Sequence, residues 1–385
     1  MKKFDVAIAG GGVIGGAIAL ELARAGLRVA VFDRQHPGQE ASWASAGILS
    51  PAPENPGMVA MVPLGQASLA LYPEFVAQVE EISGKTTGFR PKGTLEALFS
   101  RDAKAELSTI IALHHGLGLR AEPLGAEDAR QFEPALNEEV AAAVFRPDEA
   151  SVDNRALTAA IFEAAQRSGA EVFSGHGAKA MWREKNRCAG LLLQNERVAA
   201  QWTIIAAGCF SATIEGIATY APVRPAKGQM AALRGDDLKM ERVLWSEKVY
   251  LVPRNDGRIV AGATVEYAGF DKRTTAGGME KIFSAAIELA PGLADARIEE
   301  MWAGLRPDSP DHLPILGPTD IDGLLIATGH FRSGILLTPV TARLVREWII
   351  EQRVSLDWDR FSPLRFQTEK TDATNTMPAR DRARS

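Results

Sequence analysis

The sequence predicts an α/β fold in which a parallel-sheet domain is interrupted by an antiparallel-sheet domain. Residues 4–34 read as a strand, a glycine-rich turn, a helix and a second strand, which is the pattern of a parallel-sheet unit. The same kind of pattern returns after residue 150 and again after residue 303. Between residues 222 and 301, apolar runs flank an Asn-Asp-Gly turn signal that is typical of an antiparallel hairpin.

The first element is built around a glycine turn. Gly10, Gly12 and Gly15 give the spacing G-x-G-x-x-G between an apolar run at 5–9 and a helical pattern at 13–25. A side chain in this turn would block a pyrophosphate from the helix N-terminus and its free amides. The stretch therefore predicts a dinucleotide-binding, Rossmann-like domain rather than a turn that is rich in glycine only for packing.

Asp33 ends the second strand of this element, about 20 residues beyond the glycines. Its carboxylate is placed to accept hydrogen bonds from a ribose hydroxyl. A 2′-phosphate would be repelled there, because two negative groups would meet. The motif leaves open whether the dinucleotide is FAD or NAD.

A long stretch rich in small residues follows at residues 34–57. Ala41, Ser42 and the run 45–48 would let backbone amides approach a planar ligand closely. Loops of this length without structure of their own are usually functional, although a plain surface loop is the simpler alternative.

Helix and strand patterns continue along the chain. We expect Ala207 and Gly208, which follow a strand over 203–206, to bring backbone close to the dinucleotide at a second crossing of the same sheet. His114 and His115 are interpreted as a solvated helix end rather than a metal site, because adjacent helical residues point about 100° apart. The other expected helices are 66–83, 102–115 and 155–168, and the other expected strands are 93–100, 171–173, 248–253 and 258–263.

The last informative stretch predicts a strand over 323–328, a turn over 330–333 and a helix over 334–350. Arg306 and Arg332 lie in its glycine-bounded turns. A guanidinium binds a carboxylate bidentately, so two arginines that converge on the dinucleotide would suit a carboxylate ligand. The alternative is that each makes an ordinary surface ion pair.

Composition excludes several function classes. The 385 residues are 46% hydrophobic and 24% charged with a net charge of −5, so the chain is an ordinary globular protein without a basic face for nucleic acid. Only Cys188 and Cys209 occur, without metal-ligand spacing, which argues against a disulfide scaffold or metal site and favours a cytoplasmic protein. No second apolar run is long enough for a membrane span, and the first belongs to the dinucleotide element rather than to a signal peptide.

These residues resemble the D-amino-acid oxidase group of FAD-dependent amine oxidases, and within it the bacterial glycine oxidases of thiamine biosynthesis. The resemblance covers residues 6–358 and rests on the motifs AGGGVIGGAIA, SWASAGIL, VYLVPRNDGRIVAGAT, WAGLRP and GHFRSGILLTP. The last three are more specific than the glycine motif and indicate FAD rather than NAD. The flavin is expected to be non-covalent, because no cysteine follows Cys209 to attach it as in sarcosine oxidases.

The resemblance also implies a set of site residues. Arg306 and Arg332 would hold a substrate carboxylate, and Tyr250 would donate a third hydrogen bond. The turn at the flavin ring would stabilise negative charge on the reduced flavin, since a helix N-terminus follows it. The residues expected to contact FAD are Gly10, Gly12, Val13, Ile14, Gly15, Asp33, Arg34, Ala41, Ser42, Ala46, Gly47, Ile48, Ala178, Ala207, Gly208, His330, Phe331, Arg332, Ser333, Gly334, Ile335 and Leu336.

The implied reaction is oxidative deamination of glycine, sarcosine or a small D-amino acid. Hydride transfer from the substrate Cα to flavin N5 would give an imine without a general base, and water would hydrolyse the imine to glyoxylate and ammonia. Dioxygen would reoxidise the flavin to give hydrogen peroxide, with the imine used for the thiazole of thiamine. Two alternatives stay open, a D-amino-acid dehydrogenase of the same fold with a quinone acceptor and a flavin-binding protein without turnover.

Two positions depart from the glycine oxidase pattern. Lys248 stands where the pattern has a histidine, and Val265 stands where it has a methionine near the substrate. Valine is shorter than methionine, so the pocket would admit a substrate side chain larger than hydrogen.

We expect two domains. Residues 1–84, 150–221 and 303–366 would form the FAD-binding domain, and residues 85–149 and 222–302 the substrate domain. The polar tail 367–385 lacks periodicity and is expected to be disordered. The resemblance implies a homo-oligomer, a tetramer.

Overall fold

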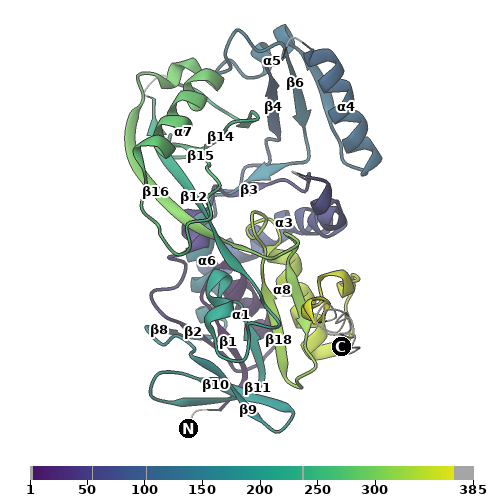
Figure 1. The fold of residues 1–385 in the computed structure, drawn as a ribbon, viewed down its shortest axis with the longest axis vertical. Helices are drawn as coiled ribbons and strands as arrows, with labels where there is room; N and C mark the ends of the chain where they lie inside the picture. The colour runs from purple at the N-terminus through teal and green to yellow at the C-terminus, as the bar shows by residue number, and fades with distance from the viewer. Residues whose placement is uncertain (1–2, 54, 101, 236–237, 368–385) are drawn as a thin grey trace, which may run out of the picture.

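The computed structural model describes residues 3–53, 55–100, 102–235 and 238–367. Within these residues two eight-stranded sheets organise the chain, one in the lower part of Figure 1 and one in the upper part. The tail for which disorder is predicted lies outside the described residues, except for Gln367. No helix of the described part is long and apolar enough to cross a membrane.

The first sheet has a parallel centre. β1 (Lys3–Ala9) lies between β11 (Arg197–Ile205) and β2 (Val29–Asp33) and runs parallel to both. Parallel neighbours require crossover connections, and α1 (Val13–Arg24) supplies the one between β1 and β2. The sheet continues with β8 (Glu171–Ser174), parallel to β2, and β18 (Leu324–Thr328), parallel to β11. Its antiparallel pairs are formed by β17 (Ile315–Pro318) with β18, by β10 (Arg187–Leu192) with β11, and by β9 (Ala180–Glu184) with β10.

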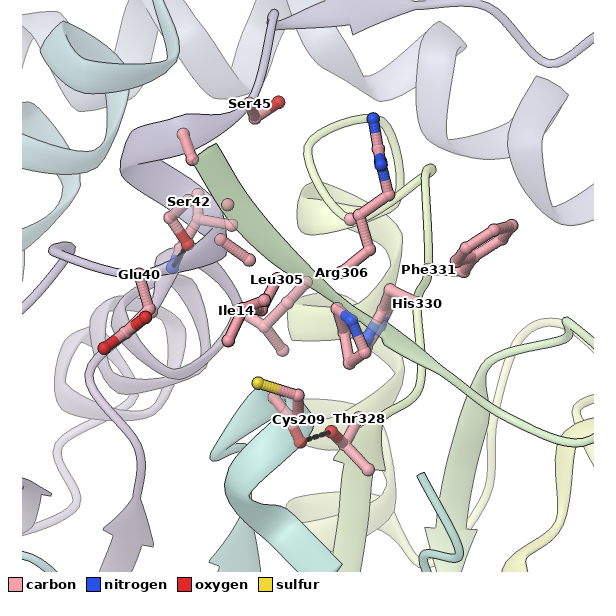
Figure 2. Close-up of a pocket in the computed structure, with 18 of the residues that line it drawn as sticks. Ile14, Glu40, Ser42, Ser45, Cys209, Leu305, Arg306, Thr328, His330 and Phe331 are labelled. Atoms are coloured by element: carbon pink, nitrogen blue, oxygen red, sulfur yellow. Dashed lines mark hydrogen bonds between the residues drawn. The ribbon is translucent and has the colours of Figure 1, made fainter. Parts of the chain in front are cut away.

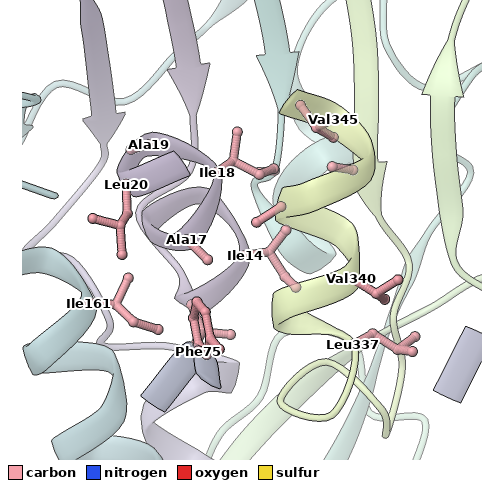
Figure 3. Close-up of a cluster of buried hydrophobic side chains, with 14 of the residues drawn as sticks. Ile14, Ala17, Ile18, Ala19, Leu20, Phe75, Ile161, Leu337, Val340 and Val345 are labelled. Carbon is pink, nitrogen blue, oxygen red and sulfur yellow. The ribbon is translucent and has the colours of Figure 1, made fainter. Parts of the chain in front are cut away.

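Helices cover one face of this sheet, as Figure 3 shows for α1 and its neighbours. Ile18 and Leu20 of α1 are fully buried. A Cβ at Gly16 would come within 2.9 Å of the Phe162 ring, so the glycine allows close packing of α1 against the next helix. The packed helices are α3 (Val62–Ser83), α6 (Asn154–Arg167) and α8 (Thr338–Glu351).

The second sheet is mainly antiparallel. Its hairpin of β14 (Tyr250–Pro253) and β15 (Ile259–Gly262) confirms the turn predicted from the Asn-Asp-Gly signal. Leu251 packs toward the helix α7 (Ala276–Leu289), whereas Val252 packs on the opposite face, so both faces are buried. The other strands are β4 (Thr94–Leu98), β5 (Glu122–Gly125), β6 (Ala142–Arg146), β12 (Arg224–Arg234), β13 (Val243–Trp245) and β16 (Arg297–Asp308).

Short elements complete the described chain. The predicted long loop contains the one-turn helix α2 (Ala41–Ala44) and β3 (Ile48–Leu49), which pairs with β7 (Ala150–Ser151). The remaining helices are α4 (Ala103–Gly116) and α5 (Ala126–Phe132), and the 3-10 turns are Pro56–Met61, Gly208–Thr213, Pro291–Leu293, Asp359–Phe361 and Pro363–Phe366.

Four local expectations were wrong. Arg306 lies on strand β16 and not in the turn that the sequence predicts. Helix α7 was not predicted, and α8 begins at Thr338 instead of residue 334, with Pro339 in its first turn, where a missing amide costs nothing. His114 is buried rather than solvated, because its ring nitrogens contact the Ile110 carbonyl at 2.8 Å and Nε of Arg146 at 2.9 Å. Burial of this histidine lowers the pKa of its ring.

Candidate active site

A cavity of about 580 Å³ lies where the two sheets meet. The first sheet contributes the residues that follow the carboxyl ends of β1, β2 and β11, which is the edge where open α/β sheets bind ligands. The second sheet contributes residues of β12, β14 and β16. Figure 2 shows Glu40 and Ser42 on one side of this cavity and Arg306, His330 and Phe331 on the other.

The glycine turn packs tightly against the residues that follow β11, and it also lines the cavity. Gly10 has a φ of +112°, and a Cβ there would overlap the Ala206 carbonyl. Gly12 is the N-cap residue of α1, whose first turn carries no acidic residue, so the helix N-terminus is available to an anion. Gly15 does not line the cavity. A Cβ at Gly15 would overlap the carbonyl of Gly10, so this glycine serves the packing of helix against turn.

Asp33 holds the glycine turn as well as lining the cavity. Its Oδ2 accepts a hydrogen bond from the Gly11 amide at 2.6 Å, and its Oδ1 accepts one from the Gln35 amide at 2.9 Å. A carboxylate oxygen has two lone pairs, so each can accept a further hydrogen bond from a ligand hydroxyl. This geometry is compatible with the ribose contact that the sequence predicts.

The loop that carries Ala41 to Ile48 is fixed by the start of α6. The Asn154 amide group donates to the carbonyls of Ser42 at 2.8 Å and Trp43 at 2.9 Å. Arg254, from the hairpin of the second sheet, donates to the Ala46 carbonyl and to Asn154 Oδ1, both at 2.9 Å. No sequence pattern indicates this clamp of Asn154 and Arg254, because nothing in a lone Asn or Arg indicates such a distant partner.

The turn between β18 and α8 lines the cavity. Tyr72 Oη donates to the Ile335 carbonyl at 2.5 Å, and Ser68 Oγ donates to the Leu336 carbonyl at 2.6 Å, so both carbonyls are paired with side chains of α3. Among the described residues, no acceptor pairs with the amides of Gly334, Ile335 and Leu336, all of which line the cavity. Three such donors suit an electron-rich ring edge.

His330 lies at the start of this turn and is buried. Its Nε2 is 3.1 Å from Thr341 Oγ1, and burial lowers the pKa of its ring to about 3. The imidazole is therefore neutral at physiological pH and adds no charge to the cavity.

The opposite end of the cavity carries the two predicted arginines. Arg306, on β16, donates to the Thr264 carbonyl at 3.2 Å, and a Cβ on the neighbouring Gly228 would overlap its guanidinium. Arg332 lines the cavity and is exposed, yet the surrounding protein lowers the pKa of its guanidinium by desolvation. Of the described residues that line the cavity, the only acidic ones are Asp33 and Glu40, which belong to the other end.

Aromatic and apolar groups shape the same end. Tyr250 packs edge-on against Trp245 with ring centroids 5.3 Å apart, and its Oη lies 3.9 Å from Met230 Sδ. Burial raises the pKa of the Tyr250 hydroxyl, an effect that the Arg306 charge opposes, so the phenol remains a neutral donor. Val265 also lines this end.

The structure brings together nearly every residue that the sequence analysis singled out. All of the predicted cofactor and substrate residues line the cavity except Gly15. Lys248 does not line it, because its ammonium pairs with both carboxylate oxygens of Glu288 at 2.8 Å on the surface. The cavity residues that were missed include Glu40, Cys209, Phe210, Gly228, Met230 and Trp245.

Comparison with known proteins decides the family. A model of the family described as FAD dependent oxidoreductase, abbreviated DAO, matches residues 5–348. The chain belongs to this family. The resemblance, the fold class and the assignment of FAD as the cofactor are thereby confirmed, and the glycine turn and the amides of Gly334, Ile335 and Leu336 fit that cofactor.

Three known proteins are similar to this FAD-dependent oxidoreductase over nearly all of its length. The glycine oxidase of Geobacillus kaustophilus is 31% identical, with 94% of this chain and 98% of that chain covered and a TM-score of 0.88. The bifunctional protein ThiO/ThiG of Synechocystis sp. is 37% identical over 94% of this chain. The hydrogen cyanide synthase subunit HcnC of Pseudomonas aeruginosa is 31% identical over 96% of this chain and 97% of its own length. The chain spans about half the length of ThiO/ThiG, of which 54% is covered.

Proposed function

We propose that this flavoprotein oxidises glycine or a similarly small amino acid to the imine. Water hydrolyses the imine to a 2-oxo acid, glyoxylate in the case of glycine, and ammonia, while dioxygen accepts the electrons and forms hydrogen peroxide. We further propose that the imine, before it is hydrolysed, is used to build the thiazole half of thiamine, by analogy with the relative named ThiO/ThiG.

One observation carries this proposal. Arg306 and Arg332 both line one end of the cavity, and the acidic lining residues of the described chain lie at the other end. An excess of positive charge in a partly closed space selects an anionic ligand. A guanidinium binds a carboxylate with two parallel hydrogen bonds, so an amino acid would be held by its carboxylate group.

The remaining side chains position the substrate and exclude water. Tyr250 is a neutral hydrogen-bond donor beside Arg306 and would complete the carboxylate site. The rings of Trp245 and Tyr250 and the side chain of Val265 limit the space for a substrate side chain. Bound FAD supplies the chemistry, since it accepts a hydride equivalent from the substrate carbon.

A side-chain general base is not required by this arrangement. His330 is hydrogen-bonded to Thr341 and has a pKa of about 3, which is far below that of an effective base at neutral pH. The substrate would enter with its amine already neutral, and the protein's part is to hold the carboxylate and thereby the reacting carbon.

Substrate kinetics of an arginine variant test the proposal. Arg306→Ala should raise KM for glycine at least about tenfold, because a charge-assisted hydrogen bond is worth about 1.5–3 kcal/mol. Arg273→Ala is the matched control, since its side chain is 87% exposed and its guanidinium pairs with Asp271. An unchanged KM in Arg306→Ala would remove the carboxylate role from this residue, and activity without peroxide would favour a quinone-linked dehydrogenase.

A further inference from the structure

A carboxylate outside the cavity organises the segment next to Arg306. Glu266 Oε1 accepts hydrogen bonds from Gln229 Nε2 at 2.7 Å and from Thr264 Oγ1 at 2.6 Å. Its Oε2 lies 3.3 Å from the ammonium of Lys227. One side chain therefore links two positions of β12 to the segment that follows β15.

The partners of Glu266 are deeply buried. The Lys227 side chain is 3% exposed, and Gln229 is fully buried. Gln229 also accepts from the Thr275 amide at 2.7 Å and donates to Thr275 Oγ1 at 3.1 Å, which ties the group to the N-terminus of α7. Because a buried ammonium and a buried amide are costly without partners, this group tolerates few alternative arrangements.

Backbone pairing fixes the same segment. The Lys227 amide donates to the Glu266 carbonyl at 2.8 Å, and the Glu266 amide donates to the Lys227 carbonyl at 2.9 Å. The Gln229 amide donates to Thr264 Oγ1 at 3.0 Å. Thr264 is therefore fixed in two ways. Its hydroxyl is hydrogen-bonded to Gln229 and Glu266, and the backbone two residues further on is paired with Lys227.

The segment contacts the cavity at two points. The Thr264 carbonyl accepts the 3.2 Å hydrogen bond from Arg306 Nη1, and the Val265 side chain lines the cavity. Gly228, between Lys227 and Gln229, leaves the space that the Arg306 guanidinium occupies. The same short stretch of β12 thus provides both the space for the guanidinium and the anchors for its acceptor.

We propose that Glu266 is a positioning residue of the substrate site, which acts through Thr264 to set the direction of the Arg306 guanidinium. The ionised carboxylate accepts from Thr264, Gln229 and Lys227 together, and this keeps the Thr264 carbonyl where it orients Arg306. The inference rests on the proposed carboxylate-binding role of Arg306.

Binding of acetate to the FAD-loaded protein tests this role without turnover. The dissociation constant is measured by calorimetry for the wild type, Glu266→Gln, Thr264→Val and the double variant. Glu266→Gln leaves the Lys227 ammonium without its anion, so we expect acetate to bind about fivefold more weakly, and a comparable loss for Thr264→Val. Both substitutions act through the position of the Thr264 carbonyl. The double variant should therefore bind acetate no more weakly than whichever single variant has the higher dissociation constant.

Two controls separate the possible failures. Glu288→Gln removes an exposed carboxylate from the Lys248 pair outside the cavity and should leave the acetate affinity within about twofold. Arg306→Ala must weaken acetate binding, and if it does not, or if the wild type does not bind acetate, the proposed function itself fails and this inference with it.

The inference alone is overturned if Arg306→Ala weakens binding while Glu266→Gln stays within about twofold of the wild type. The inference would also be overturned if the fold losses of acetate affinity in the two single variants multiplied in the double variant, because Glu266 and Thr264 would then act independently of each other. Should Glu266→Gln fail to retain FAD, Thr264→Val decides, and an unchanged acetate affinity in that variant contradicts the inference.

Discussion

The amide of Phe331 donates a hydrogen bond to the carbonyl of Pro307 at 3.0 Å. Pro307 directly follows Arg306, and Phe331 directly precedes Arg332, so this one bond brings the two arginines to the same end of the cavity. Phe331 has a φ of +46°, a conformation that is uncommon for a bulky residue and is held here by the packed turn. A strand of the second sheet and a turn of the first are thus joined at the proposed substrate site.

Gly228→Ala should weaken substrate binding without unfolding the protein. The new methyl group would take the place of the Arg306 guanidinium, which can swing away because it is the end of a flexible side chain. We expect KM for glycine to rise about tenfold at unchanged FAD content. Gly277→Ala is the control, since a Cβ there meets nothing within 4 Å. Equal KM values for the two variants would contradict the placement of Arg306.

Gly12→Val should yield protein without flavin. The valine side chain would enter the cavity at the N-terminus of α1, where the pyrophosphate of the dinucleotide is expected. The ratio of flavin to protein absorbance after purification measures the loss. Gly116→Val, at the open end of α4, should keep its flavin. Full flavin content in Gly12→Val would mean that the glycine turn does not bind the cofactor.

The element around the glycine turn also shows how much of the fold could be predicted from the sequence. Its strand, helix and second strand were predicted nearly to the residue, because the signal is local. The parallel pairing of β4 with β13 joins residues 94–96 to residues 243–245, and no local pattern indicates a partner so far along the chain. Domain boundaries and the roles of individual site residues therefore stay predictions.

The buried histidine predicts a loss of stability in acid. The pKa of His330 is about 3 in the folded protein against 6.5 for the free side chain, so below pH 6.5 the unfolded chain binds a proton that the folded chain does not. Its contribution should lower the free energy of unfolding by about 2 kcal/mol between pH 6.5 and pH 5. Urea unfolding of wild type and His330→Gln at both pH values measures this. The same pH dependence in both proteins would be inconsistent with a neutral, buried His330.

Arg254→Met should loosen the loop that lines the cavity. The variant leaves the carbonyls of Val152 and Ala46 without their donor, which we expect to lower the free energy of unfolding by about 3 kcal/mol and to speed FAD release. Arg258→Met is the matched control, because Arg258 pairs with Asp153 and Asp256 near the surface and should cost about 1 kcal/mol or less. Urea unfolding and dialysis against FAD-free buffer provide the two readouts, and equal losses would argue against the clamp.

In the candidate site too, residues in short motifs could be predicted from the sequence, whereas contacts between distant residues could not. The motifs around Arg306 and Arg332 were found because each combines arginine with glycine in a short stretch. The contact of Arg254 with the loop at Ala46 and the anchoring of Thr264 by Glu266 depend on tertiary packing. Such supporting contacts carry no spacing that a single sequence could reveal.

Anaerobic mixing of the FAD-loaded protein with glycine, sarcosine, D-alanine and D-proline in turn is the most direct measurement of the central claim. We expect that glycine or another of these small amino acids bleaches the flavin absorbance band and that air restores the band with formation of peroxide. Arg306→Ala should require a much higher amino-acid concentration for the same bleaching. A band that none of the four amino acids bleaches, in protein with full flavin content, would contradict the assignment of this chain as an amino-acid oxidase.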